Sequence, residues 1–202
     1  MPIILTIILT LLTLYFHPLA LPKLTPVSKG GSPPTTTPTP KPAVIIPKPV
    51  SDTDPWGVAI KVGEHTYKIK VQNDAVMGTP DEILQALNNL RSRNNIQLLK
   101  KDDRLCSYTQ SRAEYQGKLG KTDVHAGFTD FLENQDGFRK LGYARVGENS
   151  SYGYTLSGVH LIEFVYMQSS EHNKNQLDPA WDHACAGTSG LATNLIFATS
   201  PL

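Results

Sequence analysis

The chain has 202 residues and a formal net charge of +1, with 19 lysines and arginines set against 18 aspartates and glutamates. This scattered, balanced charge argues against a nucleic-acid partner, which normally selects a basic patch. Two cysteines without CxxC spacing are too few for a cysteine-rich mini-protein or a thiolate zinc site, but they suit a single bridge. The length allows one ordinary domain with appendages.

Residues 1–21 contain a continuous apolar run, "PIILTIILTLLTLYF", which "HPLAL" extends. Its core has the length of the apolar region of a signal peptide, and the extended run approaches the roughly 20 residues that span a bilayer. No lysine or arginine precedes the run, and "HPLALP", with Pro18 in it, is a poor match to the small-x-small site that signal peptidase cleaves. We therefore expect an extracellular or cell-surface protein, either secreted after cleavage or held in the membrane by this segment. A buried core helix is the disfavoured alternative.

Residues 22–55 hold most of the chain's prolines together with many threonines. Such a tract favours extended polyproline II structure and predicts a disordered linker. Residues 56–75 follow, where "GVAIKV" and "TYKIKVQ" alternate apolar and polar residues on either side of "GEH". This pattern predicts a small β-hairpin extension, too small to be stable alone.

The main domain is expected over residues 76–202, beginning with two helices. Thr79, Pro80 and Glu82 form a capping-box signature at the start of "TPDEILQALNNLRSRNN". Three apolar residues of this segment fall on one helical face: Ile83, Leu87 and Leu90. A second helix is expected in "DDRLCSYTQSRAEYQGKLG", where Leu105, Thr109 and Arg112 lie along one line.

After the second helix, the sequence predicts a loop through "KTDVHAGFTDF" and "ENQDGFRKLGY", and then a polar turn, "RVGENSSYG". The segment "TLSGVHLIEFVYMQ" is expected to be a helix with its apolar face in Val159, Ile162, Val165 and Tyr166. The end, "ACAGTSGLATNLIFATS", predicts two strands around a turn. Helices followed by paired strands imply an α/β layered domain.

Three polar residues are the candidate site: His125 in "DVHAGF", Glu148 in "GEN" and His172 in "SSEHNKNQ". Taken singly, each is more often a surface or satisfied core residue than a functional one. Two histidines and a carboxylate could bind zinc and leave a position open for water. Their spacing matches no local metal motif, so spacing alone is a weak signal. His160 and His183 are expected to be structural or rim residues.

The order of these segments resembles the order of motifs in the CAP superfamily (cysteine-rich secretory, antigen and pathogenesis-related proteins, or SCP-like domains). A helix reading "LNNLRSRNNIQLLKKDDRL" is followed by a histidine, by "LGYARVGEN", by "SSEHNKNQLDP" and by "HACAG". The likeness is greatest to the bacterial single-domain members and runs from about Pro80 to the C-terminus. It implies a three-layer α-β-α sandwich, an extracellular location and a central cleft that can hold a divalent metal between histidines.

Carried over residue by residue, the resemblance places His125, Glu148 and His172 in that cleft, with His125 and His172 as ligands of Zn²⁺ or another divalent metal. The family's fuller site has a second glutamate, for which Ser169 stands here, and a tryptophan, for which Tyr166 stands. Glu171 could partly replace the missing acid, although residues adjacent on a chain often point apart. Asn173 replaces the usual arginine, which puts an anion-binding role of that position in doubt.

The two cysteines fit the same picture. Cys106 is expected on the second helix and Cys185 near the start of the first terminal strand, and a sandwich could pack that helix on that sheet. An exported protein favours a disulfide between them. The alternative is two separately buried free thiols.

Three functions remain open. The leading hypothesis is a binding module without catalysis, whose ligand is an envelope polymer, a lipid or a protein. The alternative is a metal-assisted hydrolase of an extracellular peptide, ester or cell-wall substrate, with Glu148 as candidate base or third ligand. A third possibility is a structural module in which these side chains form a buried hydrogen-bond network. A serine nucleophile has little support, because no GxSxG motif is present.

Overall fold

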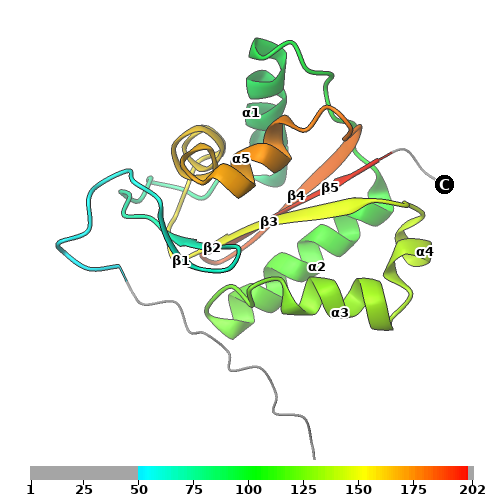
Figure 1. The fold of residues 1–202 in the computed structure, drawn as a ribbon, viewed down its shortest axis with the longest axis horizontal. Coiled ribbons are helices and arrows are strands. Elements are labelled where there is room, and N and C mark those ends of the chain that lie inside the picture. Colours follow the sequence, from blue (N-terminus) through cyan, green and yellow to red (C-terminus); the bar gives the residue numbers. More distant parts are fainter. Residues whose placement is uncertain (1–49, 200–202) are drawn as a thin grey trace, which may run out of the picture. The chain divides into compact units, whose positions relative to one another are not determined.

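The computed structural model describes residues 50–199 (Figure 1). The apolar segment expected to be a leader or anchor, residues 1–21, lies outside the described residues, and so does most of the expected linker, residues 22–49. Within the described part, no helix combines the length and the apolar character that crossing a bilayer requires.

A three-stranded antiparallel sheet forms the middle layer of the domain (Figure 1). Strand β5 (Ala192–Ala198) lies in its centre, between β3 (Val146–Tyr152) and β4 (His183–Ser189). The two terminal strands and the turn between them are those that the sequence predicts. Every residue of β5 is buried, as expected for a central strand that is covered on both faces.

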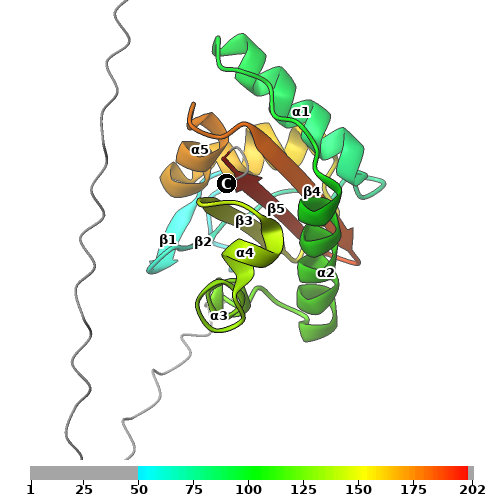
Figure 2. The same cartoon turned by 90° about the vertical axis from the view of Figure 1, so that its right-hand side faces the viewer.

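Helices cover both faces of this sheet, which confirms the α-β-α sandwich (Figure 2). Because successive side chains of a strand point to opposite faces, β5 contributes Leu195 and Phe197 to one core and Ile196 to the other. The first core lies under α1 (Pro80–Arg93), the π-helix η1 (His160–Val165), the 3-10 helix η2 (Tyr166–Gln168) and α5 (Ser170–Leu177). The second lies under α2 (Asp103–Leu119), α3 (Ala126–Asn134) and α4 (Gly137–Leu141).

The start of α1 forms as the sequence predicts. The Thr79 hydroxyl accepts the Glu82 backbone N–H at 3.2 Å, and the Glu82 carboxylate accepts the Thr79 backbone N–H at 2.7 Å. This is the expected capping box. The carboxylate of Asp102 caps α2 by accepting the backbone N–H groups of Arg104 and Leu105, and α2 ends at Gly120, whose left-handed φ of 70° suits glycine.

Two expectations about the middle of the chain are wrong. The segment after α2, expected to be a loop, contains α3 and α4, because Phe128 and Leu141 bury their side chains in the core beneath α2. The stretch expected to be a polar turn is strand β3, in which Glu148 pairs in register with Ile196 of β5. The ladder to β5 satisfies its backbone, and its polar side chains find partners in the interior.

A third expectation fails at Val159, which is 51% exposed although its spacing placed it on the apolar face. The segment winds as a π-helix from His160 to Val165, and the wider turn brings Leu161 and Ile162 into the core together. The other three residues of the expected face, Ile162, Val165 and Tyr166, are buried as predicted, so the expectation fails only at the residue that precedes the π-helix.

The hairpin expected within residues 56–75 is present as β1 (Ile60–Gly63) and β2 (Thr66–Lys68), which pair antiparallel. It does not stand apart from the main domain. The Tyr67 hydroxyl lies 3.2 Å from the hydroxyl of Ser170, and the Lys61 ammonium donates to the Glu171 carboxylate at 2.7 Å. The hairpin is therefore joined to the start of α5.

A disulfide joins Cys106 of α2 to Cys185 of β4, as expected. The Cα atoms of the two residues are 4.9 Å apart, and the bridge closes a separation of 79 residues. It ties the main helix of the second core directly to the sheet.

Candidate functional site

The carboxylate of Glu148 lies in the interior of the domain and accepts four hydrogen bonds. Its side chain is 1% exposed. Oε1 accepts from Arg112 Nε at 2.9 Å and from Asn194 Nδ2 at 2.9 Å. Oε2 accepts from His125 Nδ1 at 2.7 Å and from a second Arg112 nitrogen, Nη2, at 3.3 Å. Both oxygens are thus fully occupied, since a carboxylate offers about four lone-pair sites.

Arg112 connects this carboxylate to a second buried acid, Asp123, to which it donates two bonds of 2.8 and 2.9 Å. Burial alone would raise the pKa of both acids, but their hydrogen bonds more than offset it and lower each pKa. Burial likewise opposes the charge of Arg112, while its bonds to Asp123 and Glu148 raise the pKa of the guanidinium. All three groups are therefore charged at neutral pH.

His125 lies at the N-terminus of α3, in a sharp turn of the backbone. Val124 and His125 have φ angles of 53° and 64°, in the left-handed region that a β-branched residue such as valine rarely adopts. The turn directs the His125 ring toward β3, where its Nδ1 meets Glu148. The position of this imidazole is therefore set by both the local backbone and the buried carboxylate.

His172 lies on the first turn of α5, which Ser169 caps. The Ser169 hydroxyl is 2.7 Å from His172 Nδ1 and accepts the His172 backbone N–H at 3.3 Å. The ring also packs against Tyr166 and Tyr67, with centroids 5.0 and 6.0 Å away. Burial, and then the neighbouring His125, lower the pKa of His172 to about 4, so the ring is neutral at pH 7.

The structure brings the three residues singled out in the sequence into one cavity of about 200 Å³. His125, Glu148 and His172 all line it, although they come from a helix N-terminus, a strand and another helix. Glu171 lines the same cavity beside His172, so these two neighbours do not point apart. A further histidine of the hairpin, His65, completes that side of the cavity.

The donor groups of this cavity do not fit a divalent metal. Zinc sites in proteins use three or four protein ligands. Among residues 50–199, no group of three or more histidine, cysteine, aspartate or glutamate side chains is arranged to hold one ion. Glu148, the expected third ligand or base, has no oxygen free for a metal or for a proton. We therefore derive no chemical step through a metal.

Glu171 connects α5 to the hairpin. Its Oε1 accepts from Lys61 Nζ at 2.7 Å, and its Oε2 lies 2.9 Å from His65 Nδ1. The hydrogen bonds from Lys61 and then His65 lower the pKa of Glu171 to about 2. The carboxylate is thus committed to two partners on the hairpin.

Replacing Glu171 by glutamine is expected to loosen the hairpin without unfolding the sandwich. Because the folded-state pKa of Glu171 is depressed, its stabilising effect is present above about pH 4.5 and is lost as pH falls toward 2. Amide hydrogen exchange, corrected for intrinsic rates, should be faster over β1 and β2 in the variant at pH 7, and the difference should shrink below pH 4. Glu64→Gln, at a side chain 90% exposed, is the matched control. Unchanged hairpin exchange in Glu171→Gln would contradict this role.

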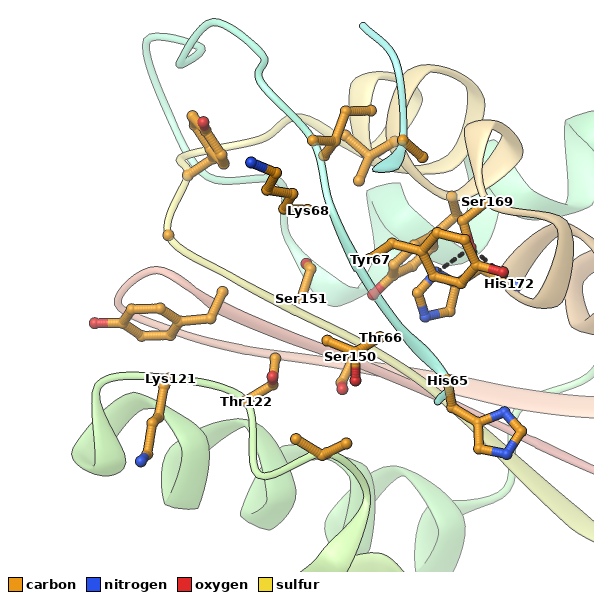
Figure 3. A pocket seen from close by; sticks show the side chains of 18 of the residues that line it. His65, Thr66, Tyr67, Lys68, Lys121, Thr122, Ser150, Ser151, Ser169 and His172 are labelled. Atoms are coloured by element: carbon orange, nitrogen blue, oxygen red, sulfur yellow. Dashed lines mark hydrogen bonds between the residues drawn. The ribbon is translucent and has the colours of Figure 1, made fainter. Parts of the chain in front are cut away.

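A larger cavity, of about 470 Å³, opens beside the first, between the hairpin and β3. Figure 3 shows Ser150 and Ser151 on β3, with Tyr67 of the hairpin on one side and Thr122, from the loop after α2, on the other. Its aromatic lining consists of Tyr67, Tyr152, Tyr154 and Tyr166. Its hydroxyl lining includes Thr66, Thr122, Ser150 and Ser151. His125 and His172 line this cavity too, so the two spaces share one wall.

Nothing in this wall forms a nucleophile–base pair. Among the described residues, one serine hydroxyl contacts a histidine ring. It belongs to Ser169, and it lies next to Nδ1 of His172. A serine nucleophile needs a base that can accept its proton at an accessible position, whereas the Ser169 residue is 2% exposed. Ser150 and Ser151 line the same cavity as His125 and His172, and among the described residues neither hydroxyl forms a hydrogen bond with a histidine ring.

Sequence reasoning missed three partners of Glu148 or of its network: Arg112, Asp123 and Asn194. One signal was available for Arg112, because it falls on the buried line of α2 with Leu105 and Thr109. A charged residue in an apolar stripe requires an opposite charge in the interior. The missed hairpin residue His65 gives no such signal in the sequence. His160 and His183 bind Asp74 and Asp182 through their rings, as expected of structural histidines.

A scan of protein-family models finds none that matches the chain, and a search of curated proteins finds no match either. Solved structures do match. One is an extracellular protein containing an SCP domain from Bacillus anthracis, 20% identical over 60% of this chain and 40% of its own, with a TM-score of 0.48. Another is a cysteine-rich secretory protein from Staphylococcus aureus, 17% identical over 58% of this chain and 37% of its own, with a TM-score of 0.48.

A third structure is an outer surface protein of Borrelia burgdorferi, 15% identical over 61% of this chain and 98% of its own, with a TM-score of 0.44. The chain thus spans about two fifths of the length of the first two structures. The descriptions of those two name the family that the sequence resembles.

Proposed function

We propose that this chain is an exported, CAP-like binding module that holds a hydroxyl-rich glycan segment of an extracellular polymer between the hairpin and β3. The observation that carries the proposal is the lining of the 470 Å³ cavity, which combines four tyrosines with serine and threonine hydroxyls. Aromatic rings can stack on the apolar face of a sugar, while hydroxyls exchange hydrogen bonds with its rim. The volume is within the usual range of a ligand site.

The polar groups of the cavity count against a lipid as the ligand. Ser150 and Ser151 stand on the strand between the hairpin and the opposite loop, where an acyl chain could not exchange hydrogen bonds with their hydroxyls (Figure 3). Burying a hydroxyl without a hydrogen bond costs about 1–3 kcal/mol. A sugar would satisfy these groups and still cover the tyrosine rings.

The buried network favours binding over catalysis. Glu148, which lines the smaller cavity, has both oxygens occupied by arginine, asparagine and histidine donors. A general base must have a lone pair within reach of the substrate proton. The role supported for Glu148 is therefore to fix the position of His125.

The test measures binding of the purified full-length chain to insoluble peptidoglycan and to chitin. Binding to phosphatidylcholine–phosphatidylglycerol vesicles and to unfolded casein is measured separately, as a test of the lipid and protein alternatives. We expect retention on at least one glycan and competition by soluble N-acetylglucosamine oligomers. Tyr67→Ala should weaken binding about tenfold, as truncation of a buried aromatic contact does. Phe164→Ala, at an aromatic residue 57% exposed and outside the cavity, is the control. Retention on vesicles or casein alone would overturn the proposal.

A further inference from the structure

The hydroxyl of Ser169 has few possible partners. The residue is 2% exposed, and the groups within hydrogen-bond distance of its oxygen are the backbone N–H of His172, at 3.3 Å, and His172 Nδ1, at 2.7 Å. The backbone N–H can only donate, so it uses one lone pair of the oxygen. The hydroxyl proton then has one acceptor in reach among the described residues, the ring nitrogen Nδ1.

This arrangement fixes the protons of the His172 ring. Ser169 lines the larger cavity, and if Nδ1 carried a proton and donated it to Ser169, the hydroxyl proton would have no partner among the described residues, which costs about 1–3 kcal/mol. Ser169 therefore donates to Nδ1, and a neutral ring must carry its own proton on the other nitrogen, Nε2. His172 consequently offers a hydrogen-bond donor, and not a lone pair, at Nε2.

His125 has the opposite arrangement. Its Nδ1 faces the carboxylate of Glu148 at 2.7 Å, and an ionised carboxylate can only accept. Nδ1 therefore carries the proton, and the Nε2 of a neutral His125 ring is an acceptor. The two imidazoles line the same cavities, so two neutral rings offer one donor and one acceptor at their Nε2 atoms.

We infer that Ser169 is a positioning residue that sets the tautomer of His172, so that His172 and His125 together recognise a neutral hydroxyl group of the ligand rather than a divalent cation. A cation would need the Nε2 lone pairs of both rings, whereas a hydroxyl accepts from one ring and donates to the other. The inference deepens the proposed glycan site and rests on it for the source of the hydroxyl. The tautomers themselves can be measured without any ligand.

The experiment is long-range ¹H–¹⁵N NMR of the histidine rings in the full-length chain at pH 7.5, with signals assigned through His125→Gln and His172→Gln. We expect the Nε2–H form at His172 and the Nδ1–H form at His125. Finding the Nδ1–H form at His172 would overturn the inference.

Substitutions at position 169 separate this role from helix capping, because serine, threonine and aspartate are all good N-caps. Ser169→Thr keeps a hydroxyl donor and should keep the His172 tautomer. Ser169→Asp supplies an acceptor only, so it should switch His172 to the Nδ1–H form and make Zn²⁺ binding detectable in calorimetric titration, in contrast to the unmodified protein. An unchanged tautomer in Ser169→Asp would contradict the inference.

Zinc titration of the unmodified protein supplies a second check. We expect that the unmodified protein does not bind Zn²⁺ through these two histidines. Zn²⁺ binding that disappears in both His125→Ala and His172→Ala would contradict the inference, and it would not affect the test of glycan retention. Correct tautomers without glycan retention would instead sink the proposed function.

Discussion

Arg112→Ala is expected to lower the free energy of unfolding by about 3–5 kcal/mol, the usual cost of removing one partner from a buried ion pair. The guanidinium is the shared partner of Asp123 and Glu148, whose side chains are 6% and 1% exposed. Its loss leaves two buried carboxylates without their counter-charge. Urea denaturation followed by circular dichroism measures the change. Arg93→Ala, which breaks an exposed pair with Glu163, should cost less than about 1 kcal/mol.

The pH dependence distinguishes lost charge from lost packing in Arg112→Ala. In the unmodified protein, the pKa values of Asp123 and Glu148 are lowered, so their contribution to stability is present above their unfolded pKa values, near 4, and is lost as pH falls below them. In the variant, burial raises both pKa values and the acids take up protons. The difference in free energy of unfolding between the unmodified protein and Arg112→Ala should therefore become smaller below pH 4. A difference that stays constant from pH 7 to pH 3 would show that Arg112 acts through packing alone.

Removing the disulfide with the double substitution Cys106→Ala and Cys185→Ala is expected to cost about 4–5 kcal/mol. The bridge closes a separation of 79 residues, and the chain-entropy model assigns roughly this value to a loop of that length. Thermal and urea denaturation with and without dithiothreitol measure the effect. Reductant should lower the stability of the unmodified protein to that of the double variant and leave the variant unchanged. Equal stability with and without reductant in the unmodified protein would contradict a stabilising bridge.

The disulfide also bears on the compartment that we propose. Disulfides persist in oxidising surroundings and are rare in the cytosol. A domain that depends on the Cys106–Cys185 bridge for several kcal/mol of stability would be poorly suited to a reducing compartment. The size of the measured loss therefore also tests the proposal of export.

The sequence by itself determined the features that depend on neighbouring residues. The capping box of Thr79 and Glu82 fixed the start of α1, because its two hydrogen bonds lie within one turn. The turn within "ACAGTSGLATNLIFATS" predicted β4 and β5 for the same local reason. The order of motifs pointed to His125, Glu148 and His172, and the fold brings all three to one cavity.

Only the tertiary structure decided what those residues can do. "RVGENSSYG" contains too few apolar residues to predict a buried strand, yet Glu148 and Asn149 are buried in β3. Their burial is possible because Arg112, from α2, and Asn194, from β5, supply hydrogen bonds across long separations in the chain. A buried carboxylate is stable only with such partners, and no local pattern encodes them. The same partners, together with His125, occupy both oxygens of Glu148. Glu148 therefore has no free lone pair with which to act as a base, and it holds the His125 ring in place.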